Sequence, residues 1–205
     1  MPTTTRRRVP FAALMLAVAA AVVSVATPAS AEPILPINYQ VEATTTLANL
    51  NQTVTITGGS FVGGLDLANG ALTGNLNLPA ATSTLALGGL PLATATFEMA
   101  PTGPLSGTVD LLTLTATTTA SFNIRLTSLR PTILPFLNLV RPTCRTATPI
   151  SLTMSGPIDL VGPSTFSGEF AVPRFRDCGL LTGILNLLIP GDGNTFSATF
   201  APAAA

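Results

Sequence analysis

The sequence predicts an all-β fold, an antiparallel β-sandwich or barrel-like fold, with one short apolar helix near the C-terminus. Short runs rich in threonine and aliphatic residues alternate with a period of two, as half-buried strands do. After residue 31, 15 prolines and 17 glycines separate these runs at short and even intervals. One later segment has helical spacing instead. Short, evenly spaced alternating runs are typical of sandwiches and barrels.

The first 31 residues have the features of an export signal. Arg6, Arg7 and Arg8 precede an unbroken apolar run of 16 residues at 11–26, and Ala29-Ser30-Ala31 fits the small-x-small rule of signal peptidase. The run is shorter than the roughly 20 residues that span a bilayer, which favours cleavage over a membrane anchor. We therefore predict a signal peptide at 1–31 and a single secreted β domain at 32–205. The paired arginines leave the general secretory and twin-arginine routes both open.

The predicted strands follow one another along residues 53–200. The run Thr53 to Thr57 alternates cleanly and is expected to end at Gly58-Gly59. In the longest run, 107–126, threonines are followed by Phe122, Ile124 and Leu126 in alternation. The other alternating positions are Leu65 and Leu67; Leu72, Leu76 and Leu78; Leu85 and Leu87; Ala93 to Met99; Ile150, Leu152 and Met154; Phe170 and Val172; and Phe196, Ala198 and Phe200.

Residues 179–189 are predicted to form the short helix. Its leucines and isoleucine recur at i, i+4 and i+8, Asp177 is placed to cap its start, and Pro190-Gly191 ends it. Few polar residues interrupt the segment, so we expect most of its circumference to be buried. One interpretation is a lid over an open end of the sheets; the other is a membrane-touching or ligand-gating helix. The lid is favoured because the segment lacks the basic polar face of an interfacial helix. The lid residues would be Leu180, Leu181, Ile184, Leu185 and Leu188.

Cys144 and Cys178 are the only cysteines in the chain. In an exported protein, a disulfide between them is expected. Catalytic or metal-binding cysteines are the alternative interpretation, but the chain has no histidine and no further cysteine to complete such a site. A bridge would close a loop of about 35 residues and stabilise the fold by about 4 kcal/mol in the chain-entropy model.

Four arginines flank the two cysteines, and a disulfide would bring them together. They are Arg141, Arg145, Arg174 and Arg176. Close to the start of the helix, these guanidinium groups are a candidate anion-binding or ligand-binding site for a phosphate or carboxylate head group. The alternative is a solvated cluster neutralised by Asp177 and Glu169.

Composition excludes several classes of function. The chain has nine arginines, nine acids and no lysine. Three of the arginines lie at 6–8, so residues 32–205 hold six arginines and nine acids, a formal charge of −3, and the basic surface of a nucleic-acid binder is absent. Without histidine or lysine, serine–histidine, cysteine–histidine and serine–lysine catalysis lack their bases. We therefore expect a protein without enzymatic activity, cofactor or metal.

Partial motifs do not change that expectation. Gly58 to Val62 misses a nucleophile elbow, because valine stands in place of the second glycine. Asp192-Gly193-Asn194 is similar to a fragment of a calcium loop but lacks the remaining ligands, which favours a turn. The carboxylates have no spacing that pairs them for glycoside hydrolysis.

The C-terminal third resembles a group of uncharacterised secreted β-rich proteins of actinobacteria. The residues that carry the resemblance are Cys144-Arg-Thr, Pro149-Ile-Ser-Leu, Pro173-Arg-Phe-Arg-Asp-Cys178-Gly-Leu-Leu-Thr, Leu185-Asn186 and Pro190-Gly-Asp-Gly-Asn-Thr195. The resemblance implies secretion from an actinobacterium and supports the disulfide. It implies no ligand and no mechanism.

Three functions are compatible with these patterns. The first is a non-catalytic secreted or envelope-associated β-module that binds an apolar or amphipathic ligand such as a lipid, which requires an apolar cavity. The second is a structural or adhesive cell-envelope protein with no small ligand, using an exposed patch such as 133–140. The third is an outer-envelope pore subunit, which is disfavoured because a spanning barrel carries aromatic girdles and the chain has 11 aromatic residues.

Overall fold

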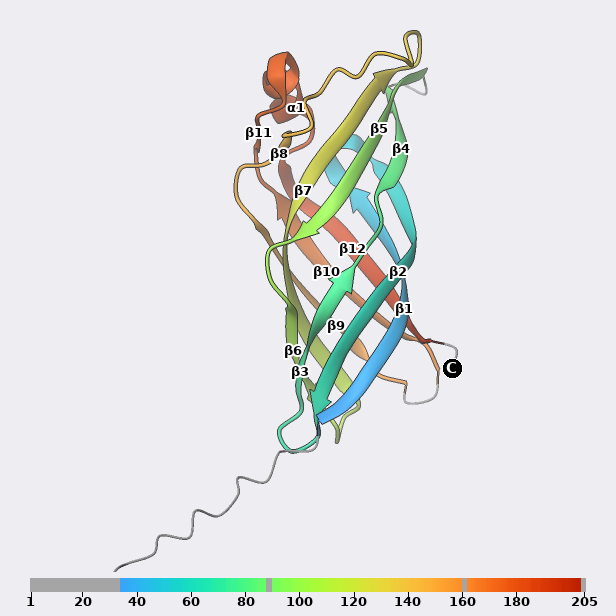
Figure 1. The fold of residues 1–205 in the computed structure, drawn as a ribbon, viewed down its shortest axis with the longest axis vertical. Coiled ribbons are helices and arrows are strands. Elements are labelled where there is room, and N and C mark those ends of the chain that lie inside the picture. Colours follow the sequence, from blue (N-terminus) through green and yellow to red (C-terminus); the bar gives the residue numbers. More distant parts are fainter. Residues whose placement is uncertain (1–33, 88–89, 160–161, 204–205) are drawn as a thin grey trace, which may run out of the picture. The chain divides into compact units, whose positions relative to one another are not determined.

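The fold is an eight-stranded antiparallel barrel with further strands outside it (Figure 1). The computed structural model describes residues 34–87, 90–159 and 162–203, so the predicted signal peptide at 1–31 lies outside the described residues. The described residues belong to one compact unit. The predicted all-β class is confirmed, and of the two architectures the chain adopts the barrel.

The barrel closes in the order β7, β6, β3, β2, β1, β12, β10, β9 and back to β7. Two short strands, β8 and β11, and a hairpin of β4 and β5 extend the wall. The strands are β1 (Ile34–Leu47), β2 (Gln52–Asp66), β3 (Ala71–Asn77), β4 (Ala81–Leu87), β5 (Leu90–Pro101), β6 (Leu105–Asp110), β7 (Thr115–Pro131), β8 (Arg145–Thr146), β9 (Ile150–Pro157), β10 (Ser164–Val172), β11 (Phe175–Arg176) and β12 (Gly191–Pro202).

The 17-residue strand β7 belongs to two walls, one in each half of its length. Residues 115–119 pair with β6 on one edge, and residues 115–122 pair with β9 on the other. Residues 122–131 pair with β5 instead, and Arg125 pairs with β8. At one end of the barrel, β7 therefore pairs on both edges with barrel strands, so the wall of the barrel is continuous around its circumference. We call this the β6–β7 end. The other end carries the hairpin, residues 132–143 and the helix, and we call it the helix end (Figure 1).

The expectation that the second strand ends at Gly58-Gly59 is wrong, because β2 continues to Asp66 through a bulge. Pairing with β1 shifts between Val41 and Ala43, so that one residue of β1 faces two of β2. Gly58 has a φ of 76°, which a residue with a side chain adopts only with strain. The glycine therefore turns the strand without breaking it.

Apolar side chains fill the lumen, and threonines cover the outer wall. The interior includes Phe61, Phe196, Leu152 and Met154, all of which are fully buried. On the outside, threonine hydroxyls of neighbouring strands pair at 2.9–3.3 Å, as they do between Thr165 and Thr199 (2.9 Å) and between Thr119 and Thr153 (3.3 Å). The alternation read from the sequence thus assigns the two faces correctly.

The predicted helix forms as a 3-10 turn, Gly179–Leu181, followed by α1 (Thr182–Leu188). The expectation that most of its surface is buried is wrong: Leu185 is buried, whereas Leu180, Ile184, Leu187 and Leu188 are exposed. The reason is that the segment stands beside β11 at the helix end, where only one side of it meets other residues. None of the helices in the described ranges has the length and hydropathy needed to cross a bilayer.

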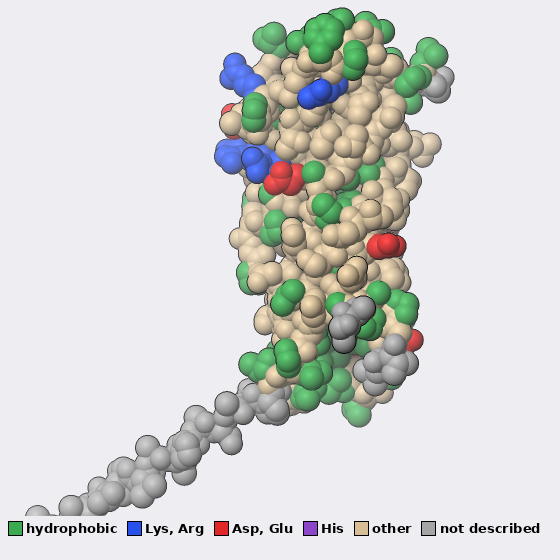
Figure 2. Space-filling view, turned by 45° about the vertical axis from the view of Figure 1, so that its right-hand side comes forward, with side chains coloured by type: hydrophobic (Ala, Val, Ile, Leu, Met, Phe, Trp, Pro, Cys, Tyr) green, Lys and Arg blue, Asp and Glu red, His purple; other side chains and the backbone are tan. Residues whose placement is uncertain are grey.

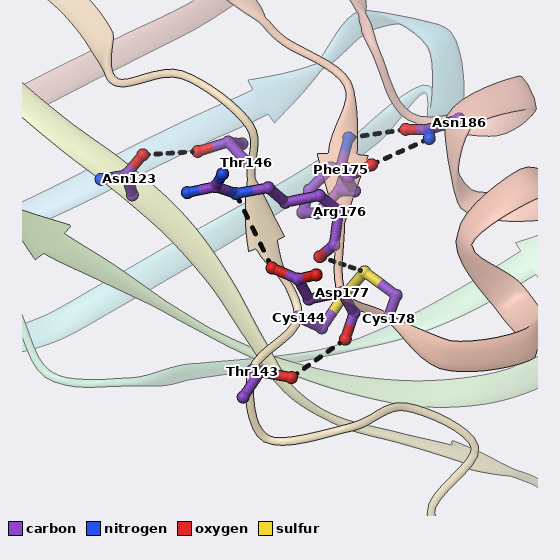
Figure 3. A network of polar contacts seen from close by, with 9 residues as sticks. All are labelled: Asn123, Thr143, Cys144, Thr146, Phe175, Arg176, Asp177, Cys178 and Asn186. Atoms are coloured by element: carbon purple, nitrogen blue, oxygen red, sulfur yellow. Dashed lines mark hydrogen bonds and ion pairs between the residues drawn. A yellow bond between two sulfur atoms is a disulfide. The ribbon is translucent and has the colours of Figure 1, made fainter.

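Asp177 does not cap the helix, contrary to expectation. Neither the 3-10 turn nor α1 has a side-chain hydrogen bond at its N-cap. Asp177 has a φ of 61°, and its carboxylate lies 3.7 Å from Nε of Arg176. The helix is held instead by Asn186, whose amide accepts a hydrogen bond from the Phe175 N–H (2.6 Å) and donates one to the Phe175 carbonyl (2.9 Å), as Figure 3 shows.

Candidate functional site

An apolar cavity of about 180 Å³ lies at the β6–β7 end. Its walls come from β1, β2, β3, β6, β7, β10 and β12, from the β6–β7 turn and from Ile158, which follows β9. The lining residues are Leu35, Ile37, Tyr39, Phe61, Leu65, Leu72, Leu105, Val109, Leu111, Leu114, Ala116, Thr118, Ile158, Ser164, Phe166 and Phe200. The deep residues are buried, and the leucines at positions 35, 111 and 114 are partly exposed, so the cavity opens between these leucines.

Small inward residues on β7 leave the space open. Ala116 and Thr118 occupy successive inward positions of β7 in the wall of the cavity, and Ser164 of β10 is a further small lining residue. Large side chains at these positions would fill this part of the lumen. Small inward residues therefore contribute to the open space.

Aromatic rings form the inner end of the cavity. The Phe200 ring packs edge-on against Phe61 and Phe166, with ring centroids 5.9 and 5.4 Å apart. Gly63 and Gly74 face each other across β2 and β3, and a Cβ atom on either would come within 3 Å of the Phe61 ring. Glycine at both positions lets that ring lie flat against the wall, which fixes the inner boundary of the cavity.

Thr118 supplies a polar group without a partner in this apolar wall. The residue is 4% exposed, and its hydroxyl has no hydrogen-bond partner among the described residues. The other buried hydroxyls are bonded: Thr45 donates to the Thr195 carbonyl, and Ser164 accepts from the Asp159 N–H. A buried hydroxyl without a partner costs about 1–3 kcal/mol. The oxygen has less than 1 Å² of accessible surface, so it is enclosed in the wall and a ligand in the cavity does not reach it.

The rim of the cavity is a tight turn at residues 111–114. The Asp110 carboxylate accepts hydrogen bonds from the Leu112 N–H (2.8 Å) and the Thr113 N–H (3.2 Å). These bonds hold the pKa of Asp110 below its ordinary value, because they stabilise the charged form. Leu114 has a φ of 52°, a left-handed conformation that costs a leucine about 1–2 kcal/mol. Its carbonyl accepts the Ile158 N–H at 2.7 Å, which holds the rim in place.

Three other hollows are weaker candidates. A cavity of about 50 Å³ at the helix end is lined by Leu47, Phe97, Phe175 and Ile189 among others, and one of about 30 Å³ lies between β3 and β5. Neither has a buried polar group without a partner among the described residues. A more open hollow of about 290 Å³ lies on the outer wall, where the threonines of β1 and β12 meet Glu169 of β10. Nothing there excludes water.

The four arginines of the predicted anion site lie together at the helix end, and all are exposed. Arg145 and Arg176 are direct cross-strand neighbours on β8 and β11. The side chain of Arg141 packs beside Gly179, at the start of the helix. Arg174 precedes β11, and its carbonyl accepts the Ala147 N–H. They line no cavity found among the described residues.

The predicted disulfide between Cys144 and Cys178 is confirmed. Both cysteines are completely buried, and the bridge joins the segment before β8 to the start of the helix (Figure 3). Thr143 adds a hydrogen bond to the Asp177 carbonyl at 3.1 Å, and Thr146 donates one to Asn123 at 3.1 Å. The start of the helix is therefore covalently fixed to the segment that leads into β8.

Of the five predicted lid residues, only Leu185 is buried. Leu181 is partly buried against the core. Leu180, Ile184 and Leu188 point into solvent. The small cavity at the helix end is bordered by Ile189, just past the helix, and none of the five lines it.

The cavity at the β6–β7 end was not predicted from the sequence. The available signal was the small inward residues of β7, flanked by threonines at every outward position from 115 to 119. That pattern indicates a strand with little bulk on its inner face. It does not show which large residues of other strands stand opposite.

Comparison of the chain with protein-family models, curated proteins and solved structures found no match. The resemblance to secreted proteins of actinobacteria stays a prediction.

Proposed function

We propose that this protein is a non-catalytic secreted or envelope-associated β-barrel that binds a small apolar or amphipathic molecule, such as part of a lipid, in the cavity at the β6–β7 end. The observation that carries the proposal is the apolar cavity of about 180 Å³, which is walled by aliphatic and aromatic side chains. An apolar body satisfies these walls, and the polar group of an amphipathic ligand would lie at the opening between Leu35, Leu111 and Leu114.

The size of the cavity limits the ligand. About 180 Å³ is slightly larger than an engineered cavity of roughly 150 Å³ that holds benzene. It is smaller than the roughly 300–1,000 Å³ of pockets that enclose a drug-sized molecule. The ligand is therefore a small ring or short alkyl group, or the end of a longer chain whose remainder leaves between Leu35, Leu111 and Leu114.

The proposed location is outside the cytosol. An intramolecular disulfide is typical of oxidising compartments, and the features of residues 1–31 favour export. The formal charge of −3 on residues 32–205 argues against a nucleic-acid partner.

The distribution of polarity argues against the pore alternative. A membrane-spanning barrel presents apolar side chains outward and polar side chains to its lumen. Here the lumen holds phenylalanine, leucine and methionine, whereas the outer wall carries paired threonines. The alternative of a structural or adhesive envelope protein without a ligand remains, and it predicts that the cavity binds nothing.

The proposal is tested by titrating the exported protein with fatty acids and alkanols of increasing chain length and measuring their binding by calorimetry. Ala116→Leu would fill the cavity and should abolish binding, whereas the control Thr117→Leu places the same side chain on the outer wall. Circular dichroism of both variants checks that the barrel is intact. Failure of the whole series to bind, together with mass spectrometry showing no co-purifying small molecule, would overturn the proposal and favour the structural alternative.

A further inference from the structure

Exposed apolar side chains gather at the helix end, on three separate elements. Figure 2 shows them at the top of the molecule. Four of them are exposed by 80% or more: Leu180 (101%), Ile133 (87%), Leu187 (81%) and Phe136 (80%). The others are Leu90, Leu92, Leu134, Leu137, Leu139, Ile184 and Leu188. We call this set the apolar cap. Such large side chains in water point to a surface that something covers.

The elements of the apolar cap are joined to one another. Thr132 donates hydrogen bonds to the carbonyls of Pro91 (from Oγ1, 3.0 Å) and Leu92 (from its N–H, 3.0 Å), which fixes 132–139 to the hairpin. The Asn138 side chain accepts the Leu129 N–H and donates to the Thr127 carbonyl, which ties the same segment to β7. Arg141 packs beside Gly179 at the start of the helix. The cap is therefore one preformed surface.

All six arginines of the described residues lie in the half of the barrel that carries the cap. Arg130 donates to the Pro135 carbonyl within the cap, Arg141 packs beside Gly179 at the start of the helix, and Arg174 immediately precedes β11. Arg125, Arg145 and Arg176 form one row across β7, β8 and β11. Four acids share this half, Glu98, Glu169, Asp177 and Asp192, and Glu42 lies in the middle part of β1, so the arginines outnumber the acids in this half.

The row of arginines is only partly neutralised. Arg125 pairs with Glu98 at 3.2 Å, and Arg176 lies 3.7 Å from Asp177. Arg145 stands between the two arginines and has no ion pair within the described ranges. Like charges directly opposite each other destabilise a sheet. An anion bound from outside would relieve that repulsion.

The β6–β7 end has the opposite charge and provides an internal comparison. Asp66 lies opposite Ile34, Asp110 ends β6, and Asp159 follows β9, and no arginine or lysine lies there in the described part of the chain. Leucines are exposed at this end too, Leu112 by 97%. The two ends therefore share exposed apolar side chains and differ in the sign of their charge.

We propose that the apolar cap docks onto an anionic lipid surface, with its leucine, isoleucine and phenylalanine side chains in the headgroup region and the arginines against the lipid phosphates. Stable membrane binding needs two signals, and an apolar insertion combined with a basic patch supplies them. The apolar side chains of the cap project from three short elements of the described chain and form no groove that would hold a peptide. A bilayer surface is the partner that fits such an arrangement. The disulfide at Cys144 and Cys178 holds the surface preformed.

Co-sedimentation of the exported protein with vesicles tests this proposal. The vesicles contain phosphatidylcholine alone or with about a third phosphatidylglycerol. We expect binding to the anionic vesicles, at least roughly tenfold weaker binding to the neutral ones, and weakening as salt rises from about 0.1 M to about 0.5 M. Equal binding to both vesicle types, or no binding, would overturn the proposal.

Matched variants separate the cap from general hydrophobicity. Phe136→Ser combined with Leu187→Ser should reduce binding to anionic vesicles by roughly tenfold or more, since each substitution removes an inserted side chain. Leu112→Ser at the opposite end is the control and should change binding by less than about twofold. Arg145→Gln should reduce the salt dependence. A lipid partner would be refuted if Leu112→Ser reduced vesicle binding as much as the cap variant does. It would also be refuted if the protein bound no vesicles but self-associated as its concentration rose, and the cap variant abolished that self-association. Since these substitutions leave the cavity untouched, ligand binding there succeeds or fails independently.

Discussion

Replacing Thr118 by valine should make the ligand-free protein more stable. Valine has the shape of threonine without the hydroxyl, and the Thr118 hydroxyl is buried with no partner among the described residues. Leaving such a group unsatisfied costs about 1–3 kcal/mol, so its removal should raise the free energy of unfolding by about 1–2 kcal/mol. For a barrel of this size the melting temperature should rise by about 2–8 °C.

Two other threonines provide matched controls for this substitution. Thr146 is equally buried, but its hydroxyl donates to Asn123 and accepts the Ile124 N–H, so Thr146→Val should lower the free energy of unfolding by about 1–3 kcal/mol. Thr117 is exposed on the outer wall, and Thr117→Val should change it by less than about 0.5 kcal/mol. Urea unfolding of the three variants compares the effects directly.

The same substitution should leave ligand binding in the cavity unchanged while it stabilises the fold. Thr118 lines the cavity, but its hydroxyl oxygen has less than 1 Å² of accessible surface, so a ligand does not reach it. If Thr118→Val destabilises the barrel as Thr146→Val does, the hydroxyl has a partner in the folded protein and this prediction is refuted.

Three further predictions follow from the polar and covalent contacts. Replacing Cys144 and Cys178 by alanine should lower the free energy of unfolding by about 2–4 kcal/mol, measured in urea, since the bridge closes a loop across 34 positions; an unchanged midpoint would contradict this. Asn194→Ala should cost about 2–4 kcal/mol in thermal unfolding, because the buried amide accepts the Ala48 N–H and donates to the carbonyls of Phe170 and Gly191; a loss below about 1 kcal/mol would mean that the bonds are replaced. The pKa of Asp110 is lowered in the folded state, so its contribution is present above the unfolded pKa and is lost as pH falls through the folded pKa; an NMR titration should show its midpoint below the ordinary value of an aspartate, and Asp110→Asn should remove the contribution at neutral pH.

Period-two alternation was sufficient to predict most of the strands and the face that each presents to the core, but β1 (Ile34–Leu47) and the two-residue strands β8 and β11 were not predicted. It is a local property, since successive side chains of a strand point to opposite sides whatever the strand pairs with. Cys144 and Cys178 could be paired because the chain offers no other cysteine. The continuation of β2 through Gly58-Gly59 could not be predicted, because a glycine pair ends a strand or forms a bulge depending on the partner strand, here the shift between Val41 and Ala43.

For the helix, the local sequence pattern predicts the element but not its burial. Its i, i+4 spacing predicted the element correctly, yet the same leucines suggested burial. Burial depends on what packs around an element, and α1 meets little beyond β11 and the preceding turn. The apolar cap and the row of Arg125, Arg145 and Arg176 depend likewise on strand neighbours that are far apart in sequence.

By itself, the sequence determined the all-β class, the helix, the disulfide and the shortage of catalytic bases, since each follows from residue type and near-neighbour spacing. Only the tertiary structure decided that the sheet closes into a barrel, that Ala116 and Thr118 face an open cavity, and that apolar side chains share one end with every described arginine. Closure and cavities depend on the register between distant strands and on the sum of side-chain volumes across the lumen, and neither quantity is contained in any local segment of the chain.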